Sequence, residues 1–92
     1  MKLSLGPCGF CDGQGEVHVR VSDSGSCIFG MCDECFYVWR DKTMQEDPFS
    51  LDTPPRGVTA EQYAQWTQIR EPSHWANMEE VIRFGWGDVV RV

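Results

Sequence analysis

Two Cys-x-x-Cys pairs separated by twenty residues constrain this chain more than any other feature of its sequence. The first pair reads Cys8-Gly-Phe-Cys11 and the second reads Cys32-Asp-Glu-Cys35. Each pair forms a tight turn that points two sulfur atoms at one metal ion, and two such pairs at this spacing are typical of a four-thiolate zinc site. We therefore predict one structural Zn²⁺ per chain, with four ligands: Cys8, Cys11, Cys32 and Cys35.

Four thiolates fill a tetrahedral coordination shell and leave no position for water or a substrate, so the predicted site supports the fold. Binding free energies of roughly 10–16 kcal/mol are typical of such sites, and much of that energy stabilises the folded state. The same ligands also hold iron or an iron–sulfur cluster, and the sequence leaves these metals open. A redox reading of each pair lacks the βαβ pattern that surrounds dithiol catalysts.

The length and the cysteine count limit the kind of protein. The chain has 92 residues and five cysteines. One domain over residues 1–92 is expected at this length, and a metal ion commonly supplements so small a core. The odd cysteine count argues against a closed disulfide framework, and no secretory signal or membrane-length apolar run is evident. We therefore expect a cytoplasmic protein that does not bind membranes.

The first half predicts a small module of the α+β class. Polar and apolar residues alternate over 16–21, and a second apolar run covers 27–31, so the two segments predict a β-hairpin across a serine-rich turn. From about Asp33 the apolar spacing predicts a helix. A Cys pair, a hairpin, a second Cys pair and a helix make a zinc-ribbon or treble-clef module over residues 7–46.

The second half predicts a helical extension. Residues 47–58 contain three of the five prolines and predict a loop. Capping boxes that begin at Thr59 and Asn77 predict two short helices, and the valine-rich segment 88–92 predicts a last strand. Because a region as short as 59–92 cannot build a core alone, we expect it to pack on the zinc module.

Few other residues carry chemistry. Cys27 lies outside both pairs, and we interpret it as a small buried apolar residue, with a ligand or a reactive thiol as the alternative. His18 alternates with valines and is predicted on the solvated face of its strand. His74 lacks an accompanying nucleophile or acid motif, so we predict no catalytic residue and no enzyme activity. We predict core positions for Trp66, Trp75 and Trp86. The alternative is that they anchor an interface.

The charge favours a protein partner. The formal net charge is −6, and four thiolates with one zinc ion would bring it to about −8. The eight basic residues form no run. Nucleic-acid binding needs cations that displace phosphate counterions, so it is disfavoured although many zinc ribbons do bind nucleic acid. An acidic surface suits a basic protein partner, and a homodimer is also compatible with the sequence.

The two pairs resemble a known zinc-binding domain. An aromatic residue precedes Cys11, and Met31 precedes the Cys-Asp-Glu-Cys sequence. These features are similar to the N-terminal four-cysteine domain of ClpX, the unfoldase partner of a bacterial protease. The resemblance covers about residues 7–42 and implies a treble clef that dimerises and captures adaptors and substrates. It does not extend to an ATPase module, so it implies no unfolding activity.

A second resemblance concerns the first pair alone. The segment Cys8-Gly-Phe-Cys11-Asp-Gly13-Gln-Gly15 matches the Cys-x-x-Cys-x-Gly-x-Gly unit of the zinc region of the DnaJ chaperone family. That family uses four such units, whereas the second pair here continues into Phe36. Both resemblances imply a zinc module that handles other proteins.

The sequence thus predicts a non-enzymatic, zinc-stabilised protein–protein interaction module that serves as an adaptor or regulator. The partner itself is not identified by any motif. The alternative is a stand-alone acidic inhibitor, such as a phage anti-host protein or the immunity protein of a toxin. A nucleic-acid-binding zinc ribbon ranks below both because of the charge.

Overall fold

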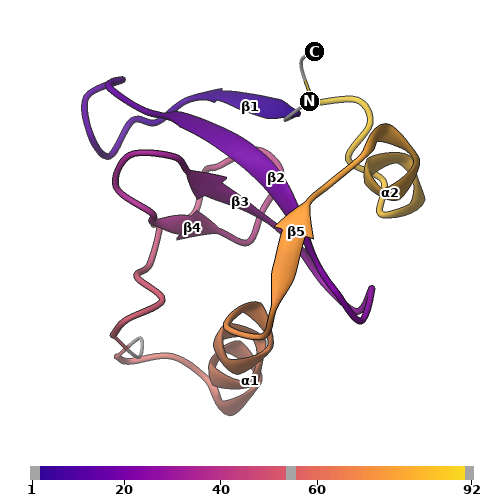
Figure 1. Cartoon of the computed structure of the whole chain (residues 1–92). Coiled ribbons are helices and arrows are strands. Elements are labelled where there is room, and N and C mark those ends of the chain that lie inside the picture. Colours follow the sequence, from indigo (N-terminus) through magenta and orange to yellow (C-terminus); the bar gives the residue numbers. More distant parts are fainter. Residues whose placement is uncertain (1–2, 54–55, 91–92) are drawn as a thin grey trace.

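The computed structural model describes residues 3–53 and 56–90. An antiparallel sheet forms the centre of the molecule, with the strand order β1-β2-β3-β4 and with β5 also paired to β2 (Figure 1). Its strands are β1 (Ser4–Pro7), β2 (Glu16–Ser22), β3 (Ile28–Cys32), β4 (Val38–Trp39) and β5 (Ser73–Trp75). The two helices are α1 (Ala60–Ile69) and α2 (Met78–Arg83). The chain is therefore a small α+β protein, as its sequence predicts.

The sheet is built around β2. One edge of this strand pairs with β3, which confirms the predicted hairpin. The other edge is shared, because β1 pairs with residues 16–18 and β5 pairs with residues 20–22. The change of partner occurs at Val19, whose N–H donates to the carbonyl of Leu3 (2.8 Å) and whose carbonyl accepts from the N–H of Ala76 (2.9 Å). Segments that are far apart in the sequence thus meet on one strand.

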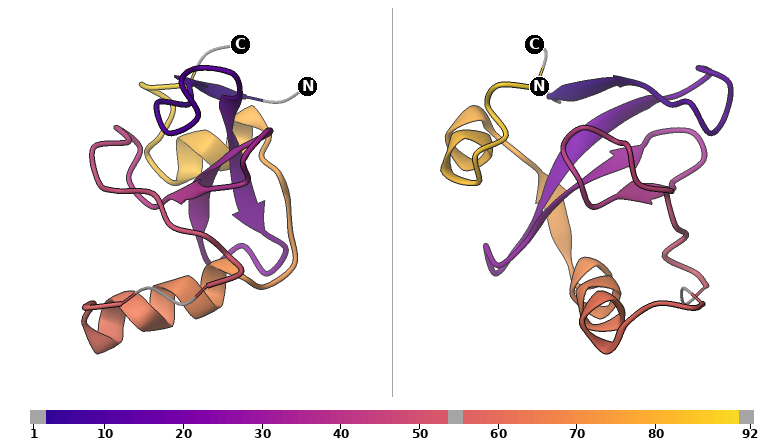
Figure 2. Two further views of the ribbon diagram at one scale, coloured as in Figure 1. Left: turned by 90° about the vertical axis from the view of Figure 1, so that its left-hand side faces the viewer. Right: turned by 180° about the vertical axis from the view of Figure 1, so that it is seen from behind.

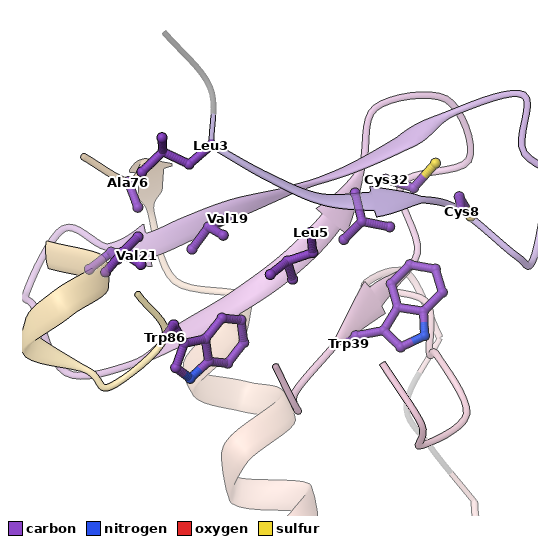
Figure 3. Packing of buried hydrophobic residues seen from close by; sticks show 11 residues of the cluster. Leu3, Leu5, Cys8, Val19, Val21, Cys32, Trp39, Ala76 and Trp86 are labelled. Carbon is purple, nitrogen blue, oxygen red and sulfur yellow. The ribbon is translucent and has the colours of Figure 1, made fainter. Parts of the chain in front are cut away.

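Apolar side chains cover both faces of the sheet. Because successive side chains of a strand point to opposite faces, the three valines of β2 share one face. The cluster on that face contains Leu3, Leu5, Cys8, Val17, Val19, Val21, Cys32, Trp39, Ala76, Val81 and Trp86. Leu5 lies between the indoles of Trp39 and Trp86 (Figure 3). A second cluster on the opposite face joins Phe29, Val38 and Ile69.

The predicted extension packs against both faces. Val81 of α2 and the following Trp86 enter the first cluster, and Ile69 of α1 enters the second. The two helices lie at opposite ends of β5 (Figure 2). Both capping boxes are confirmed, since the side chains of Thr59 and Asn77 each accept the N–H of the residue three positions on. The extension is thereby held by strand pairing as well as by helix packing.

Within the described residues, the helix predicted from about Asp33 does not form, and that prediction was wrong. The chain reverses within residues 33–37 and returns as β4, which pairs antiparallel with β3. Phe36 has a φ of 60°, and a left-handed residue interrupts a right-handed helix. Val38 and Trp39 are both buried and point to opposite faces, so the apolar spacing follows the period of a strand.

Three further strand assignments differ from the sequence prediction. Residues 87–89 form a turn and residue 90 belongs to no strand, so the predicted last strand does not form over 88–90, and residues 91–92 lie outside the described part of the chain. The strands β1 and β5 have no counterpart in the prediction. Both are short, and both are specified by backbone hydrogen bonds to β2 and not by a local pattern.

The proline-containing loop over 47–58 is ordered where it is described. Phe49 exchanges two backbone hydrogen bonds with Val38 of β4, of 3.0 and 3.1 Å. The indole N–H of Trp66 donates to the carbonyl of Ser50 at 3.0 Å. These contacts fasten the loop to the sheet and to α1. None of the helices among the described residues is long and apolar enough to cross a membrane.

Candidate metal centre

The two Cys-x-x-Cys segments lie at neighbouring ends of two β-hairpins. Residues 8–15 connect β1 to β2, and residues 33–37 connect β3 to β4. Because β2 and β3 are adjacent in the sheet, both connections emerge on the same side of the molecule, at the left in Figure 1. We call residues 8–15 the first knuckle and residues 32–37, which include the last residue of β3, the second knuckle. Their proximity follows from the hairpin pairing, so residues far apart in sequence reach one point in space.

Matching backbone hydrogen bonds close the two knuckles. In the first, the N–H of Cys8 donates to the carbonyl of Gly15 at 2.9 Å. In the second, the N–H of Cys32 donates to the carbonyl of Tyr37 at 3.0 Å. A left-handed residue follows the last cysteine of each knuckle: Asp12 has a φ of 56° and Phe36 a φ of 60°. The two knuckles are therefore related in backbone conformation as well as in sequence.

Gly15 is required because the knuckles approach each other closely. A Cβ atom at this position would lie 2.5 Å from Sγ of Cys32 and 2.8 Å from Cβ of Glu34. Its neighbour Gly13 has a φ of 77° and is needed for backbone conformation instead. The steric role of Gly15 depends on the other knuckle, so the sequence of the first knuckle alone does not show it.

The four predicted ligands converge. The sulfur atoms of Cys8, Cys11, Cys32 and Cys35 all lie within 4.8 Å of one another. Two pairs that join the knuckles are closer still, Cys8 with Cys35 at 3.7 Å and Cys11 with Cys32 at 3.8 Å. A tetrahedron with metal–sulfur bonds of about 2.3 Å has sulfur–sulfur edges of about 3.8 Å. The donor set therefore fits a tetrahedral metal ion such as zinc.

The pKa values of the cysteine thiols depend on burial and on nearby backbone amides. Burial raises the pKa of Cys8 to about 12 and also raises the pKa of Cys35. Burial opposes the charged form of Cys32 as well, but backbone hydrogen bonds from Cys35 and Glu34 lower its pKa. The amides of these two residues lie 3.5 and 3.4 Å from the sulfur of Cys32. A metal ion that displaces the thiol protons would neutralise buried negative charge in this site.

Cys27 stands apart from the cluster, as predicted. Its side chain is half-buried and packs against the second apolar cluster, and its sulfur lies 3.9 Å from the carbonyl oxygen of Gln68. The residue thus contacts α1 and contributes to packing. The prediction that Cys27 is not a ligand agrees with this placement, although the side chain is less buried than expected.

His18 is buried, so the prediction of a solvated side chain was wrong. Its ring lies edge-on to the indole of Trp75, with centroids 5.7 Å apart. Nε2 lies 3.3 Å from a carboxylate oxygen of Glu16, and Nδ1 has no hydrogen-bond partner. On the face of β2 that alternation predicts to be polar, the ring of Trp75 from β5 packs against His18. Burial of His18 therefore depends on strand pairing that the local pattern does not show.

His74 connects three segments. Nδ1 lies 2.8 Å from Oδ1 of Asp23 in the β2–β3 turn, and Nε2 lies 2.8 Å from Oε2 of Glu80 in α2. These hydrogen bonds raise the pKa of His74, with Asp23 as the largest cause. Because both ring nitrogens face carboxylates, the residue acts as an ionic link between β5, α2 and the turn.

The tryptophans of the extension serve mainly in the core. Trp66 and Trp86 are buried, which confirms the core interpretation for these two. Trp75 is half-buried, and the guanidinium of Arg20 lies 4.4 Å from the centroid of its ring. None of the three is therefore a fully exposed anchor.

Comparison with protein-family models, with curated proteins and with solved structures finds no match for this chain.

Proposed function

We propose that the protein is a non-enzymatic module in which one zinc ion stabilises a surface that binds another protein. The convergence of four cysteine sulfurs is the observation that carries this proposal. Zinc binds thiolates well, and four of them complete its tetrahedral shell. Such a metal ion shapes the chain around it and has no position left for a substrate.

The arrangement of strands supports a zinc ribbon as the form of this module. Each Cys pair lies between two paired strands, and the chain continues as β4 after the second pair. A treble clef would continue as a helix at this point, and the proposed resemblance to the ClpX domain also implies that helix. The resemblance then rests on Phe10 before Cys11 and on Met31 before the Cys-Asp-Glu-Cys sequence, and the expectation of a module that handles proteins is kept as part of the proposal.

The charge distribution supports a protein and not a nucleic acid as the partner. Zinc bound by four thiolates would bring the net charge from −6 to about −8. Phosphate groups would be repelled by such a surface, whereas a basic protein would be attracted. Phe10 and Phe36, which are neighbours of Cys11 and Cys35 in the sequence, are exposed, and this exposure supports contact with a partner protein.

The first test measures metal and nucleic-acid binding on the same sample. Elemental analysis of the purified protein should find about one zinc per chain. A gel-shift assay with DNA and RNA at low salt should show no complex. Iron as the native metal would refute the zinc assignment, and tight, salt-sensitive nucleic-acid binding would overturn the proposed function.

The second test seeks the partner directly. Crosslinking in the source cell, followed by purification of the protein, should retain a specific partner protein. Chelation of zinc before crosslinking should abolish the product, because loss of the metal removes the folded surface. A partner that is retained equally by the metal-free chain would contradict a zinc-stabilised surface.

A further inference from the structure

Each of the two knuckles exposes an aromatic side chain, and one ring contact joins the knuckles. Phe10 of the first knuckle is 53% exposed and Phe36 of the second is 62% exposed. Phe10 stacks on Tyr37, with ring centroids 4.1 Å apart and an angle of 24° between the planes. Since Tyr37 directly follows Phe36, the aromatic surface crosses from one knuckle to the other. It lies directly beside the cysteine cluster.

The left-handed turn of the second knuckle does not itself require the bulky side chain of Phe36. Its φ of 60° is left-handed, a conformation that glycine adopts without the steric conflict a Cβ atom introduces. Its ring is also largely exposed, so burial does not offset that conflict. A bulky residue held in an unfavourable conformation at the surface points to a contact outside the folded chain.

Of lysine, arginine, aspartate and glutamate, the two knuckles contain only the acidic residues. Residues 3–19 and 21–39 contain no lysine or arginine. Exposed carboxylates lie in or beside both knuckles, at Asp12, Glu16, Asp33 and Glu34. A zinc ion with four thiolates adds a further charge of about −2. The surface therefore combines exposed rings with a strong negative field.

A groove adjoins Phe10 and extends this surface. It has a volume of about 450 Å³ and lies between the first knuckle and the loop after β4. Phe10, Trp39, Met44 and Pro48 provide apolar walls, and Glu46 and Asp47 provide carboxylates. Glu46 also pairs with Arg40 at 3.3 Å. The lining of the groove thus combines apolar side chains with carboxylates.

We infer that the knuckle end of the sheet, comprising Phe10, Phe36, Tyr37 and this groove, is a docking surface for an arginine-bearing basic segment of the partner protein. The inference deepens the proposed function and rests on it. A guanidinium stacks on an aromatic ring and pairs with neighbouring carboxylates at the same time. An apolar side chain of the same segment would enter the groove. A second copy of the chain does not meet this charge requirement, because it carries the same negative surface.

The test uses the zinc-loaded full chain and two labelled peptides. One fluorescent peptide repeats Gly-Arg-Leu-Arg, and its counterpart repeats Gly-Glu-Leu-Glu. Fluorescence anisotropy at low salt should detect binding of the arginine peptide and none of the glutamate peptide. Amide shifts in NMR spectra should be largest in residues 9–12 and 34–37. Added salt should weaken the complex.

A substitution separates docking from folding. Phe36→Gly relieves the left-handed strain, so its thermal midpoint should equal or exceed that of the original chain. We expect affinity for the arginine peptide to fall about tenfold or more, since a ring contact is lost. Ile82→Ala serves as the matched control, because Ile82 is also 62% exposed but lies on α2. This control should bind the peptide with unchanged affinity.

The inference is overturned if Phe36→Gly binds the arginine peptide as well as the original chain does. It is equally overturned if the arginine peptide does not bind, if the glutamate peptide binds as tightly, or if the shifts locate it elsewhere. Self-association through the knuckles in sedimentation experiments would assign the surface to a second copy instead. A crosslinked cellular partner that tolerates Phe36→Gly would leave the proposed function standing and refute this surface alone.

Discussion

The two sides of the sheet are stabilised by different means. At the knuckle side, the chain forms two connections with exposed aromatic rings, and four cysteine sulfurs converge between them, with Cys8 and Cys32 buried. At the other side, Val81 of α2 belongs to the apolar cluster. So do Ala76, which follows β5, and Trp86, which follows α2 (Figure 3). A metal ion substitutes for a core where tight loops leave few large side chains to bury.

The two sides are also connected. Cys8 and Cys32 are fully buried and belong to the same apolar cluster as Val81 and Trp86. The metal site is therefore an extension of the core and not a separate attachment. We therefore expect loss of the metal on the knuckle side to unfold the whole chain. Substitutions on the α2 side should lower the free energy of unfolding only in part and should leave the four cysteines able to bind metal.

Removal of the metal should have the largest effect. Chelation of zinc, or Cys32→Ser, should unfold the chain, because metal binding of roughly 10–16 kcal/mol is of the same size as the whole stability of a small domain, which is about 5–15 kcal/mol. Circular dichroism and tryptophan fluorescence would follow the transition. A chain that keeps its cooperative unfolding after chelation would show that the apolar cluster is sufficient.

Truncation of the core on the α2 side should have the next largest effect. Trp86→Ala should reduce the free energy of unfolding by about 3–5 kcal/mol, through lost burial and the cavity left behind. The zinc content of the folded fraction should remain about one per chain. Tyr63→Ala is a suitable control, since Tyr63 is an exposed aromatic residue on α1. If Trp86→Ala lost zinc at temperatures where it is still folded, metal binding would depend directly on packing on the α2 side.

Replacement of Cys27, the cysteine outside the two pairs, should have a smaller effect. Cys27→Ser should leave the zinc content unchanged, because the residue contacts α1 and lies outside the sulfur cluster. We expect a packing cost of about 1–2 kcal/mol. Elemental analysis and chemical denaturation measure the two quantities. A drop in bound zinc would mean that the ligand set is different.

Removal of the ionic link at His74 should have the smallest effect on the free energy of unfolding, and the size of that effect should depend on pH. Hydrogen bonds to Asp23 and Glu80 raise the pKa of His74 above its ordinary value of 6.5. The stabilisation is therefore complete below pH 6.5 and is lost as the pH rises through the higher folded pKa. For so exposed a group we expect about 0.2–1 kcal/mol.

The measurement compares zinc-loaded samples of the original chain and His74→Gln in chemical denaturation at pH 6 and pH 8. The original chain should be the more stable of the two at pH 6, and the difference should shrink at pH 8. A difference that grows between these values would reverse the assigned sign.

The sequence alone determined the features that depend on spacing and local chemistry. The four candidate ligands follow from Cys-x-x-Cys spacing, because a tight turn can place both sulfurs on one ion. The β2–β3 hairpin follows from alternation, and the starts of α1 and α2 follow from the capping boxes at Thr59 and Asn77. Each of these signals is contained within a few neighbouring residues.

Tertiary structure decided the features that depend on a distant partner. The segment after Cys35 forms β4 and not a helix, because it pairs with β3 after the left-handed turn at Phe36. His18 is buried because Trp75 of β5 packs edge-on to its ring. Gly15 is needed because Sγ of Cys32 arrives from the other knuckle. Backbone pairing and steric contact across the sheet join residues that share no local pattern, so only the folded chain reveals them.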